Sequence, residues 1–446
     1  MKEKKRHCAG TVCTPTLFSL PPVKKRAVTL AFDGGNVSSD AGLLALRQVD
    51  RTLGLSRALA QVLPDPRDPS RVEHSLVSLV RQRLFGLCCG YEDLNDHDTL
   101  RHDLAWQTAV EQLRPLASSP TLCRFENAAG RDAAWAMHRV LVEQFLASHR
   151  RAPKELILDF DTTADRVHGQ QEGAFFHAHY GDYCFLPLYV FCGEQLLVAA
   201  LRPGNSRPTR GAWAILKFLV QALRAKWPQV KITVRADSGF ARWRMLRWCE
   251  DHGVHYIVGF GKNSRLLALA RRWTGRAAKG FARTKEKQRL FGEVKYAAHR
   301  WDCKRRVLVK AEHNDQGANP RFVLTNLEGD PQALYDEVYC ARGEMENRIK
   351  EQQMGLFSDK TSCQDWWANQ FRLLLSSSAY VLMESLRRVG LKGTELARAQ
   401  VTTLRTRLLK IGAVVERNTR RVRFKLASGS PYAEIFRRVL QAFSTG

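Results

Sequence analysis

The sequence predicts a protein of the α/β class, built around a mixed β-sheet and flanked by helical regions. Residues 31–150 carry apolar residues at helical spacing, whereas after Arg151 short apolar runs follow one another closely and then alternate with helical patterns. Successive strands favour antiparallel pairing and strand–helix alternation favours parallel pairing, so one sheet should contain both. The 446 residues suffice for two or three domains.

The first 150 residues are expected to form a basic arm, 1–30, and a helical DNA-binding region, 31–150. Ser39 should cap a helix that buries apolar side chains at helical spacing, and Ser70 with Glu73 forms a capping box for a second helix. These buried positions are Leu43, Leu46, Val49 and Leu53 in the first helix, and Val72, Leu76, Leu79, Val80, Leu84 and Leu87 in the second. The basic residues of the arm are Lys2, Lys4, Lys5, Arg6, Lys24, Lys25 and Arg26.

The predicted sheet follows Arg151. Its strands are Glu155–Asp161, Tyr183–Phe191, Gln195–Leu201, Lys231–Asp237, His255–Gly259, Val307–Glu312 and Arg321–Asn326. Helices fit Thr209–Lys226, Ala241–His252, Pro331–Gln353 and Asp365–Arg388.

Residues 389–446 are expected to form a basic C-terminal region. It should hold a basic helix near Leu396–Lys410 and a hairpin, Val414–Leu426, that turns at Asn418. The hairpin's charges are solvated by default, but their alternation with Val422 and Phe424 fits a sheet face on DNA almost as well.

The net charge of +26 indicates a nucleic-acid partner, because phosphates bind basic proteins through counterion release. An acidic membrane surface is the second candidate, although no apolar run of transmembrane length is present. Residues 262–310 hold 16 Lys or Arg against 3 acids. The 11 cysteines form no CxxC pair, which is typical of a reducing cytoplasm.

The run LILDFDTTAD at 156–165 places two carboxylates, Asp159 and Asp161, on one face of an apolar strand. A buried carboxylate is costly unless a cation, a proton or several donors satisfy it. Two interpretations of Asp159 are equally favoured: it supports the ligands of a metal ion, or it is a structural acid hydrogen-bonded to the backbone. Asp237 ends a neighbouring strand, where α/β sheets place their sites.

A third acid, Glu346, is predicted to lie on a long helix. It follows Tyr339 by seven residues and Arg342 by four, so the three side chains share one face of that helix. Glu344 and Glu351 are its rivals. Arg342 either pairs with Glu346 on the helix or binds DNA phosphate. Carboxylates from three elements predict a Mg²⁺ site, and two such ions can stabilise both oxygens of a phosphoryl transfer.

These motifs resemble those of bacterial insertion-sequence transposases of the DDE class, most closely the "thirteen-eighty" group. The resemblance rests on AspThrThr at 161–163, ArgAlaAspSerGlyPhe at 235–240 and the Tyr339, Arg342, Glu346 spacing of the Tyr-Arg-Glu-Lys signature. N-terminal stretches at 38–43, 90–98 and 119–127 are also similar to that group. The signature expects Lys seven residues after the Glu, where this chain has Gln353.

The resemblance implies a ribonuclease-H-like catalytic domain, 151–388, interrupted by a β-rich basic insertion at about 262–331. It implies that Asp161, Asp237 and Glu346 bind two Mg²⁺, with Mn²⁺ as a substitute, and that Tyr339, Arg342 and Lys350 contact DNA. The implied activity is cleavage at terminal inverted repeats of double-stranded DNA and strand transfer into target DNA. A homodimer would pair the two ends, in a bacterial cytoplasm and nucleoid.

Several alternatives stay open from the sequence. Trp273 and Trp301 either stack on an extruded base or pack in a core. Asp93, Asp96, His97, Asp98, His102 and Asp103 fit no standard zinc spacing, so a polar loop or helix start is favoured. His168, His177 and His179 are expected to have surface or packing roles. A decayed transposase that represses by binding repeats, or a nuclease without strand transfer, are the rival functions.

Overall fold

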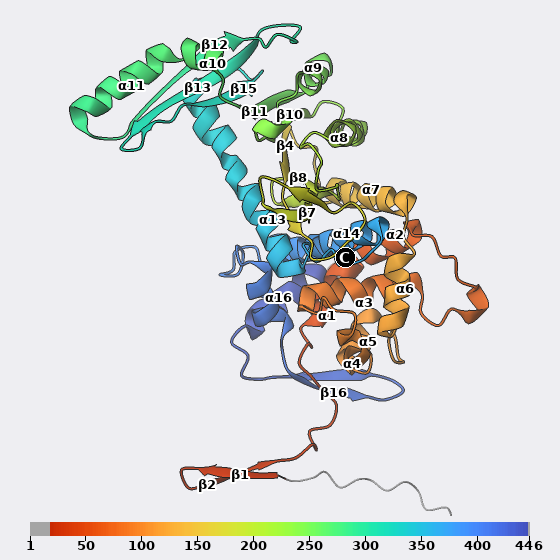
Figure 1. The fold of residues 1–446 in the computed structure, drawn as a ribbon. Coiled ribbons are helices and arrows are strands. Elements are labelled where there is room, and N and C mark those ends of the chain that lie inside the picture. Colours follow the sequence, from red (N-terminus) through yellow and green to blue (C-terminus); the bar gives the residue numbers. More distant parts are fainter. Residues whose placement is uncertain (1–17, 445–446) are drawn as a thin grey trace, which may run out of the picture.

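The computed structural model describes residues 18–444, so the arm residues Lys2, Lys4, Lys5 and Arg6 lie outside the described part. A mixed sheet lies at the centre of the fold (Figure 1). Its strand order is β12-β13-β15-β11-β10-β4-β8-β9, and the short β14 pairs with β13. The strands are β4 (Glu155–Thr162), β8 (Leu188–Cys192), β9 (Gln195–Ala200), β10 (Lys231–Ala236), β11 (His255–Phe260), β12 (Gln288–Tyr296), β13 (Arg305–Asn314), β14 (Gly317–Ala318) and β15 (Arg321–Thr325).

The pairing confirms the mixed sheet. Strand β10 pairs in parallel with β4 and β11, while β4–β8, β8–β9 and β11–β15 are antiparallel. The predicted strand Tyr183–Phe191 is wrong as one element. Pro187, which has no N–H to donate, separates β8 from β7 (Asp182–Phe185). Strand β7 instead forms a small sheet with β5 (Asp165–Arg166) and β6 (Phe175–His177).

Alternation of side chains separates the two faces of the central sheet. Leu156, Leu158 and Phe160 of β4 enter one core with α8 (Ala212–Lys226) and α9 (Trp243–Asp251). Asp159 and Asp161 therefore point to the opposite face, as the period of two predicts. The opposite face packs against α13 (Gly343–Leu356) and α14 (Trp366–Ser385).

The predicted long helix Pro331–Gln353 is interrupted. Helix α12 (Pro331–Ala333) continues into a π-helical turn, Leu334–Tyr339, a 3₁₀ turn, Cys340–Arg342, and then α13. In Figure 1 this segment runs from the insertion sheet down to the helical body. The candidate residues Tyr339 and Arg342 thus lie in the turns that precede α13, whereas Glu346 and Lys350 lie within it.

The N-terminal region is helical, as predicted, but both predicted caps are wrong. Helix α1 begins at Leu43 after Gly42, so Ser39 lies too early to cap it. Helix α3 begins at Leu76, and Ser75 caps it by accepting from the Ser78 amide at 3.3 Å. Ser70 lies instead in a 3₁₀ turn, Pro69–Arg71, where its amide donates to the side chain of Asp68, the residue that caps the turn. The helices are α1 (Leu43–Leu53), α2 (Leu55–Val62), α3 (Leu76–Cys89), α4 (Asp96–Leu100), α5 (Leu104–Val110), α6 (Ser119–Asn127) and α7 (Arg131–Ala147).

The insertion is less β-rich than expected. Its first half forms α10 (Ser264–Leu269) and α11 (Arg271–Thr284), and only then do β12 to β15 follow. These strands extend the central sheet through the β15–β11 pairing and form no separate sheet of their own. Figure 1 shows the resulting lobe with α11 beside β12 and β13.

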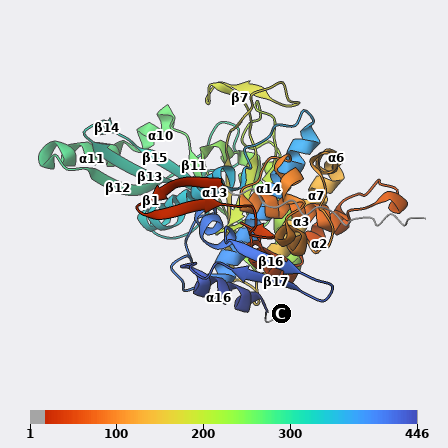
Figure 2. The same ribbon diagram turned by 90° about the horizontal axis from the view of Figure 1, so that it is seen from below.

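The chain ends pack differently from one another. Hairpin β1 (Phe18–Val23) and β2 (Arg26–Leu30) lies away from the body in Figure 1, and Figure 2, seen from below, shows it in front of the body. The predicted C-terminal hairpin is confirmed as β16 (Ala413–Arg417) and β17 (Val422–Leu426), and β3 (Val37–Ser38) joins it. The predicted basic helix near Leu396–Lys410 is shorter than expected and consists of α15 (Val401–Leu404) and a π turn, Arg405–Leu409. A further helix, α16 (Ala433–Ser444), follows the hairpin. Among residues 18–444, no helix is long and apolar enough to span a membrane.

Candidate active site

Three carboxylates come together from three elements at the edge of the central sheet. Asp161 lies near the end of β4, Asp237 directly follows the neighbouring β10, and Glu346 lies in the first turn of α13. Because β4 and β10 are parallel, the two aspartates leave the sheet at the same end. The charges of Asp237 and Glu346 both act on Asp161, so the three predicted acids share one site.

The guanidinium of Arg342 connects two of these acids. Its Nη1 donates to Asp161 Oδ2 at 2.8 Å, and its Nη2 donates to Glu346 Oε1 at 2.8 Å. The sequence left open a helix pair with Glu346 or a DNA contact. The structure adds Asp161, 181 residues away, as a second partner. Arg342 is therefore the cation that the carboxylates hold in this state.

The electrostatics of the site are dominated by burial. Burial raises the pKa of Asp161 to about 6, and Asp237 and Glu346 act in the same direction while Arg342 opposes them. The pKa of Arg342 is raised because Asp161 and Glu346 outweigh its own burial.

Asp159 is held by a different cation. It lies directly opposite Arg235 in the β4–β10 register, and its two oxygens accept from Arg235 Nε at 2.5 Å and Nη2 at 2.7 Å. Arg235 also donates to the Val338 carbonyl at 2.6 Å, which ties the sheet to the turn before Tyr339. This arrangement favours the structural alternative for Asp159.

Tyr339 reaches the site through a gap left by Gly259. A Cβ on Gly259 would lie 2.6 Å from the Tyr339 hydroxyl oxygen and 2.9 Å from the Ser238 amide nitrogen. Asp237 Oδ1 accepts from the Gly239 amide at 2.9 Å, which fixes the turn that carries it. Burial raises the pKa of Tyr339, so its phenol stays protonated and able to donate.

The rivals of Glu346 are placed elsewhere. Glu344 is exposed. Glu351 is buried, and its Oε1 accepts from Arg387 Nη1 and the Val401 amide, each at 2.8 Å. Only Glu346 of these three is joined to Asp161 through Arg342.

Gln353, which replaces the Lys of the signature, has a buried acid as its partner. Its Nε2 donates to Asp165 Oδ1 at 2.8 Å. Burial raises the pKa of Asp165 to about 8, so the neutral amide of Gln353 faces a protonated acid. Lys350 is exposed one turn after Glu346.

The two tryptophans of the insertion are packed. Trp273 is 8% exposed and lies against Gly292 of β12, where a Cβ would come within 2.0 Å of the ring. Trp301 contacts Phe260 and Tyr296. Both positions favour the core-packing alternative over stacking on a base.

Other polar residues from the sequence also have structural partners. His97 is buried against Arg83 at 3.0 Å and Gln82 at 3.3 Å, and burial with the Arg83 charge lowers its pKa to about 3. His177 and His179 pack with Tyr180.

Tyr180 is a site residue that the sequence did not indicate. Burial raises its pKa, and Asp161 and Asp237 are close enough to add to this effect.

The donor set fits a hard divalent cation. Within the described part of the chain, no three Asp, Glu, His or Cys side chains are close enough to form a ready-made metal cage. Asp161 and Glu346 nonetheless pair with one guanidinium on which the charge of Asp237 also acts, so three acids stand against a single cation. Carboxylate oxygens are the ligands that Mg²⁺ prefers.

Convergent carboxylates in a basic α/β protein are the arrangement expected of a site for metal-dependent phosphoryl transfer. The family model for the transposase DDE domain group 1 matches residues 20–445, and the chain belongs to this family of DDE transposases. No curated protein matches the chain. Among solved structures, a piggyBac transposase synaptic complex with hairpin DNA matches with a TM-score of 0.39 and 12% identity, over 83% of this chain and 80% of that chain.

Proposed function

We propose that the chain is the transposase of a bacterial insertion sequence, close to the "thirteen-eighty" group, with a ribonuclease-H-like core. It binds terminal inverted repeats in double-stranded DNA, cleaves at their ends and joins them to a target. The observation that carries the proposal is the Asp161–Arg342–Glu346 contact, which joins a sheet acid to a helix acid beside Asp237. Such an arrangement gains nothing for simple DNA binding, because carboxylates repel phosphate.

Asp161, Asp237 and Glu346 would hold divalent metal, Mg²⁺ or Mn²⁺, in the proposed mechanism. When bound, the metal would supply charge stabilisation for the attacking and leaving oxygens of the phosphodiester. Arg342, whose guanidinium pairs with Asp161 and Glu346 in this structure, would supply a bidentate contact to a DNA phosphate.

Other residues of the chain would position the substrate. Tyr339, whose phenol stays protonated, donates to a phosphate oxygen next to Asp237. Lys350, exposed beyond Glu346, supplies a further cation along the same helix. The exposed basic residues of 262–310 bind the flanking DNA. Two protomers would pair the two ends of the element during the reaction.

A cleavage assay tests the proposal. Purified protein is mixed with labelled DNA that carries the ends flanking the gene, with and without Mg²⁺, as wild type, Asp237→Asn and Glu344→Gln. We expect metal-dependent nicking at the repeat boundary in the wild type and in Glu344→Gln, whose exposed acid lies outside the site, and none in Asp237→Asn. DNA binding without cleavage by the wild type, in Mg²⁺ and in Mn²⁺, would favour a transposase-derived repressor.

A further inference from the structure

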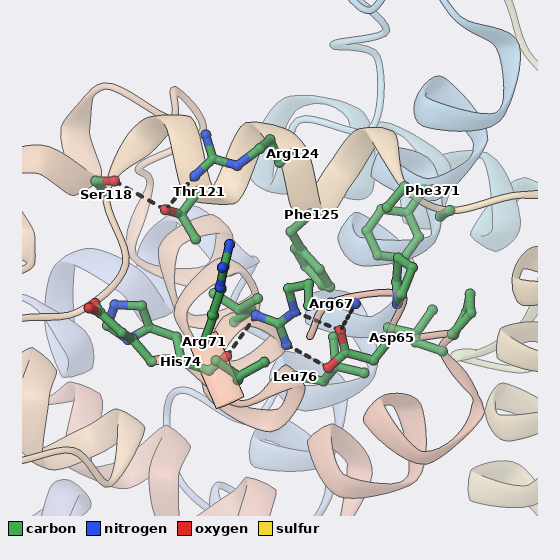
Figure 3. A pocket seen from close by; sticks show the side chains of 18 of the residues that line it. Asp65, Arg67, Arg71, His74, Leu76, Ser118, Thr121, Arg124, Phe125 and Phe371 are labelled. Carbon is green, nitrogen blue, oxygen red and sulfur yellow. Dashed lines mark hydrogen bonds and ion pairs between the residues drawn. The ribbon is translucent and has the colours of Figure 1, made fainter. Parts of the chain in front are cut away.

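A cavity of about 500 Å³ opens in the N-terminal helical region, on residues that the proposed catalysis does not use (Figure 3). Its apolar wall includes Leu76, Leu79, Phe125 and Phe371. Phe125 of α6 packs edge-on against Phe371 of α14 at a centroid distance of 5.2 Å. The cavity therefore has the volume and the aromatic lining of a small-molecule site.

Two residues that line this cavity each carry a buried polar atom without a hydrogen-bond partner among the described residues. His74 is 8% exposed, and its Nδ1 accepts or donates no hydrogen bond. Arg101 Nε is also buried and unpaired. Both residues line the cavity. A buried polar group without a partner is costly, so a ligand that supplies hydrogen bonds to these two atoms would be favoured in this cavity.

The charged residues that line the cavity favour an anionic ligand, because arginines outnumber acids among them. Arg71 and Arg124 lie at its exposed rim, and Arg101 lies deeper. Arg67 is already neutralised by Asp65 and donates to the His74 carbonyl at 2.8 Å, which holds that backbone in place. Arg71 has only a distant exposed partner, Asp68, at 3.7 Å. Glu73 is the remaining acid of the lining.

The imidazole of His74 adds a neutral hydrogen-bonding group. Its burial, followed by the positive charges of Arg114 and Arg101, lowers its pKa, so the ring is uncharged at neutral pH. A neutral imidazole can donate to or accept from the polar edge of a heterocycle, whereas the arginines select a phosphate. The cavity thus combines an apolar wall, a polar edge and a phosphate-binding rim.

We propose that this cavity binds one nucleotide unit, with the base against Phe125 and the phosphate among Arg71, Arg101 and Arg124. The nucleotide is either an unpaired residue of the DNA bound by the transposase or a free mononucleotide. The DNA source rests on the proposed function. Unpaired bases are bound in this way by aromatic side chains with arginines at the backbone.

Two titrations of the full chain test the proposal. The first uses a fluorescently labelled deoxyadenosine monophosphate, with inorganic phosphate as competitor. The second uses a duplex with a single unpaired 2-aminopurine, whose fluorescence reports unstacking. The variants are Ala128→Trp, which fills the cavity from its exposed edge, and Arg124→Gln, which removes one rim charge. Arg139→Gln, an exposed arginine of α7 outside the cavity, is the matched control.

Saturable binding that weakens about tenfold or more in Ala128→Trp and Arg124→Gln, but not in Arg139→Gln, would support the proposal; tenfold corresponds to about 1.4 kcal/mol. A response to the mononucleotide alone assigns the free ligand as the source, and a response to the duplex assigns the DNA. Absence of saturable binding to both probes, or equal weakening by the control, would overturn it.

Nucleotide binding and DNA cleavage are measured separately, so a failure of this proposal can be distinguished from a failure of the proposed function. Asp237→Asn should bind the nucleotide as the wild type does while cleaving nothing. Intact end cleavage without nucleotide binding would reject the cavity site alone. Nucleotide binding by a chain that never cleaves would reject the proposed function alone.

Discussion

Arg235 and Asp159 lie opposite each other on the parallel strands β10 and β4 and form a bidentate ion pair that both strands bury. The same guanidinium donates to the Val338 carbonyl. One buried cation thus joins the two strands that carry Asp161 and Asp237 to the segment that carries Tyr339. The spacing of the site depends on this pair, although neither residue belongs to the three convergent acids.

Removal of this pair's cation should be costly for folding. Arg235→Met leaves the carboxylate of Asp159 buried without its partner, so we expect the free energy of unfolding to fall by about 3–5 kcal/mol. Urea unfolding measures the loss. The double variant with Asp159→Asn should recover part of it, and Arg247→Met, which removes an exposed arginine of α9, should change stability by no more than about 0.5 kcal/mol. Equal effects of Arg235→Met and Arg247→Met would contradict the structural role.

The charge of Arg342 should determine the pH above which Asp161 is ionised and able to bind metal. Arg342→Ala removes the one charge that lowers the pKa of Asp161, so that pKa should rise above about 6. The acidic limb of the metal-dependent cleavage profile should therefore move to higher pH, and the cleavage rate at its optimum should fall by about 10–100-fold through loss of a charged hydrogen bond. Arg342→Lys keeps a charge and should show a smaller shift. An unmoved acidic limb in Arg342→Ala would show that Asp161 does not depend on this contact.

Gly259 should be required for the position of Tyr339. A Cβ at Gly259 would displace the phenol or the Ser238 amide, and misplacement of site groups by about 1 Å can cost about 100-fold in rate. We expect Gly259→Ala to lose most cleavage. Gly261→Ala is the matched control, since its Cβ would meet nothing within 4 Å and its backbone is not left-handed. Similar cleavage rates in the two variants would count against a role for Tyr339.

Asp165 should make stability fall as the pH rises. Its folded-state pKa of about 8 lies above the unfolded value of about 3.9, so the folded chain binds more protons between those values and ionisation opposes folding. The slope from this group is at most about 1.4 kcal/mol per pH unit. Asp165→Asn mimics the protonated acid and should unfold with a shallower pH dependence between pH 5 and pH 8. Gln353→Lys should also flatten the slope, because a cation beside Asp165 lowers its pKa. Parallel profiles of all three proteins would disprove the assignment.

Much of the fold follows from local patterns in the sequence. Closely spaced strands followed by alternating strands and helices predicted the mixed sheet, and the period of two along a strand predicted the shared face of Asp159 and Asp161. The α3 start was mispredicted because Asp68 and Ser75 compete as caps with the pair Ser70 and Glu73. Such competition depends on where the chain turns, which local pattern does not fix.

The details of the site depend on contacts between distant residues. The Arg342–Asp161 hydrogen bond spans 181 residues, and the Arg235–Asp159 pair follows only from the register of two strands. Tyr180 enters the site from a small separate sheet, and no periodicity marks it. Helices α10 and α11 are not predicted from the sequence, because the β-rich character of the insertion is inferred from the family resemblance and not from its own residue pattern.

The π turn at Leu334–Tyr339 fixes the rotational phase of the helix that carries Glu346. A π turn holds one residue more than an α-helical turn, and each residue of an α-helix rotates the side chain by about 100°. If one residue were deleted here and a regular helix resulted, Glu346 would swing away from Asp161 by roughly a quarter of a circle or more. The number of residues in the π turn therefore determines the direction in which Glu346 points, and length changes between Leu334 and Tyr339 would be tolerated less well than substitutions.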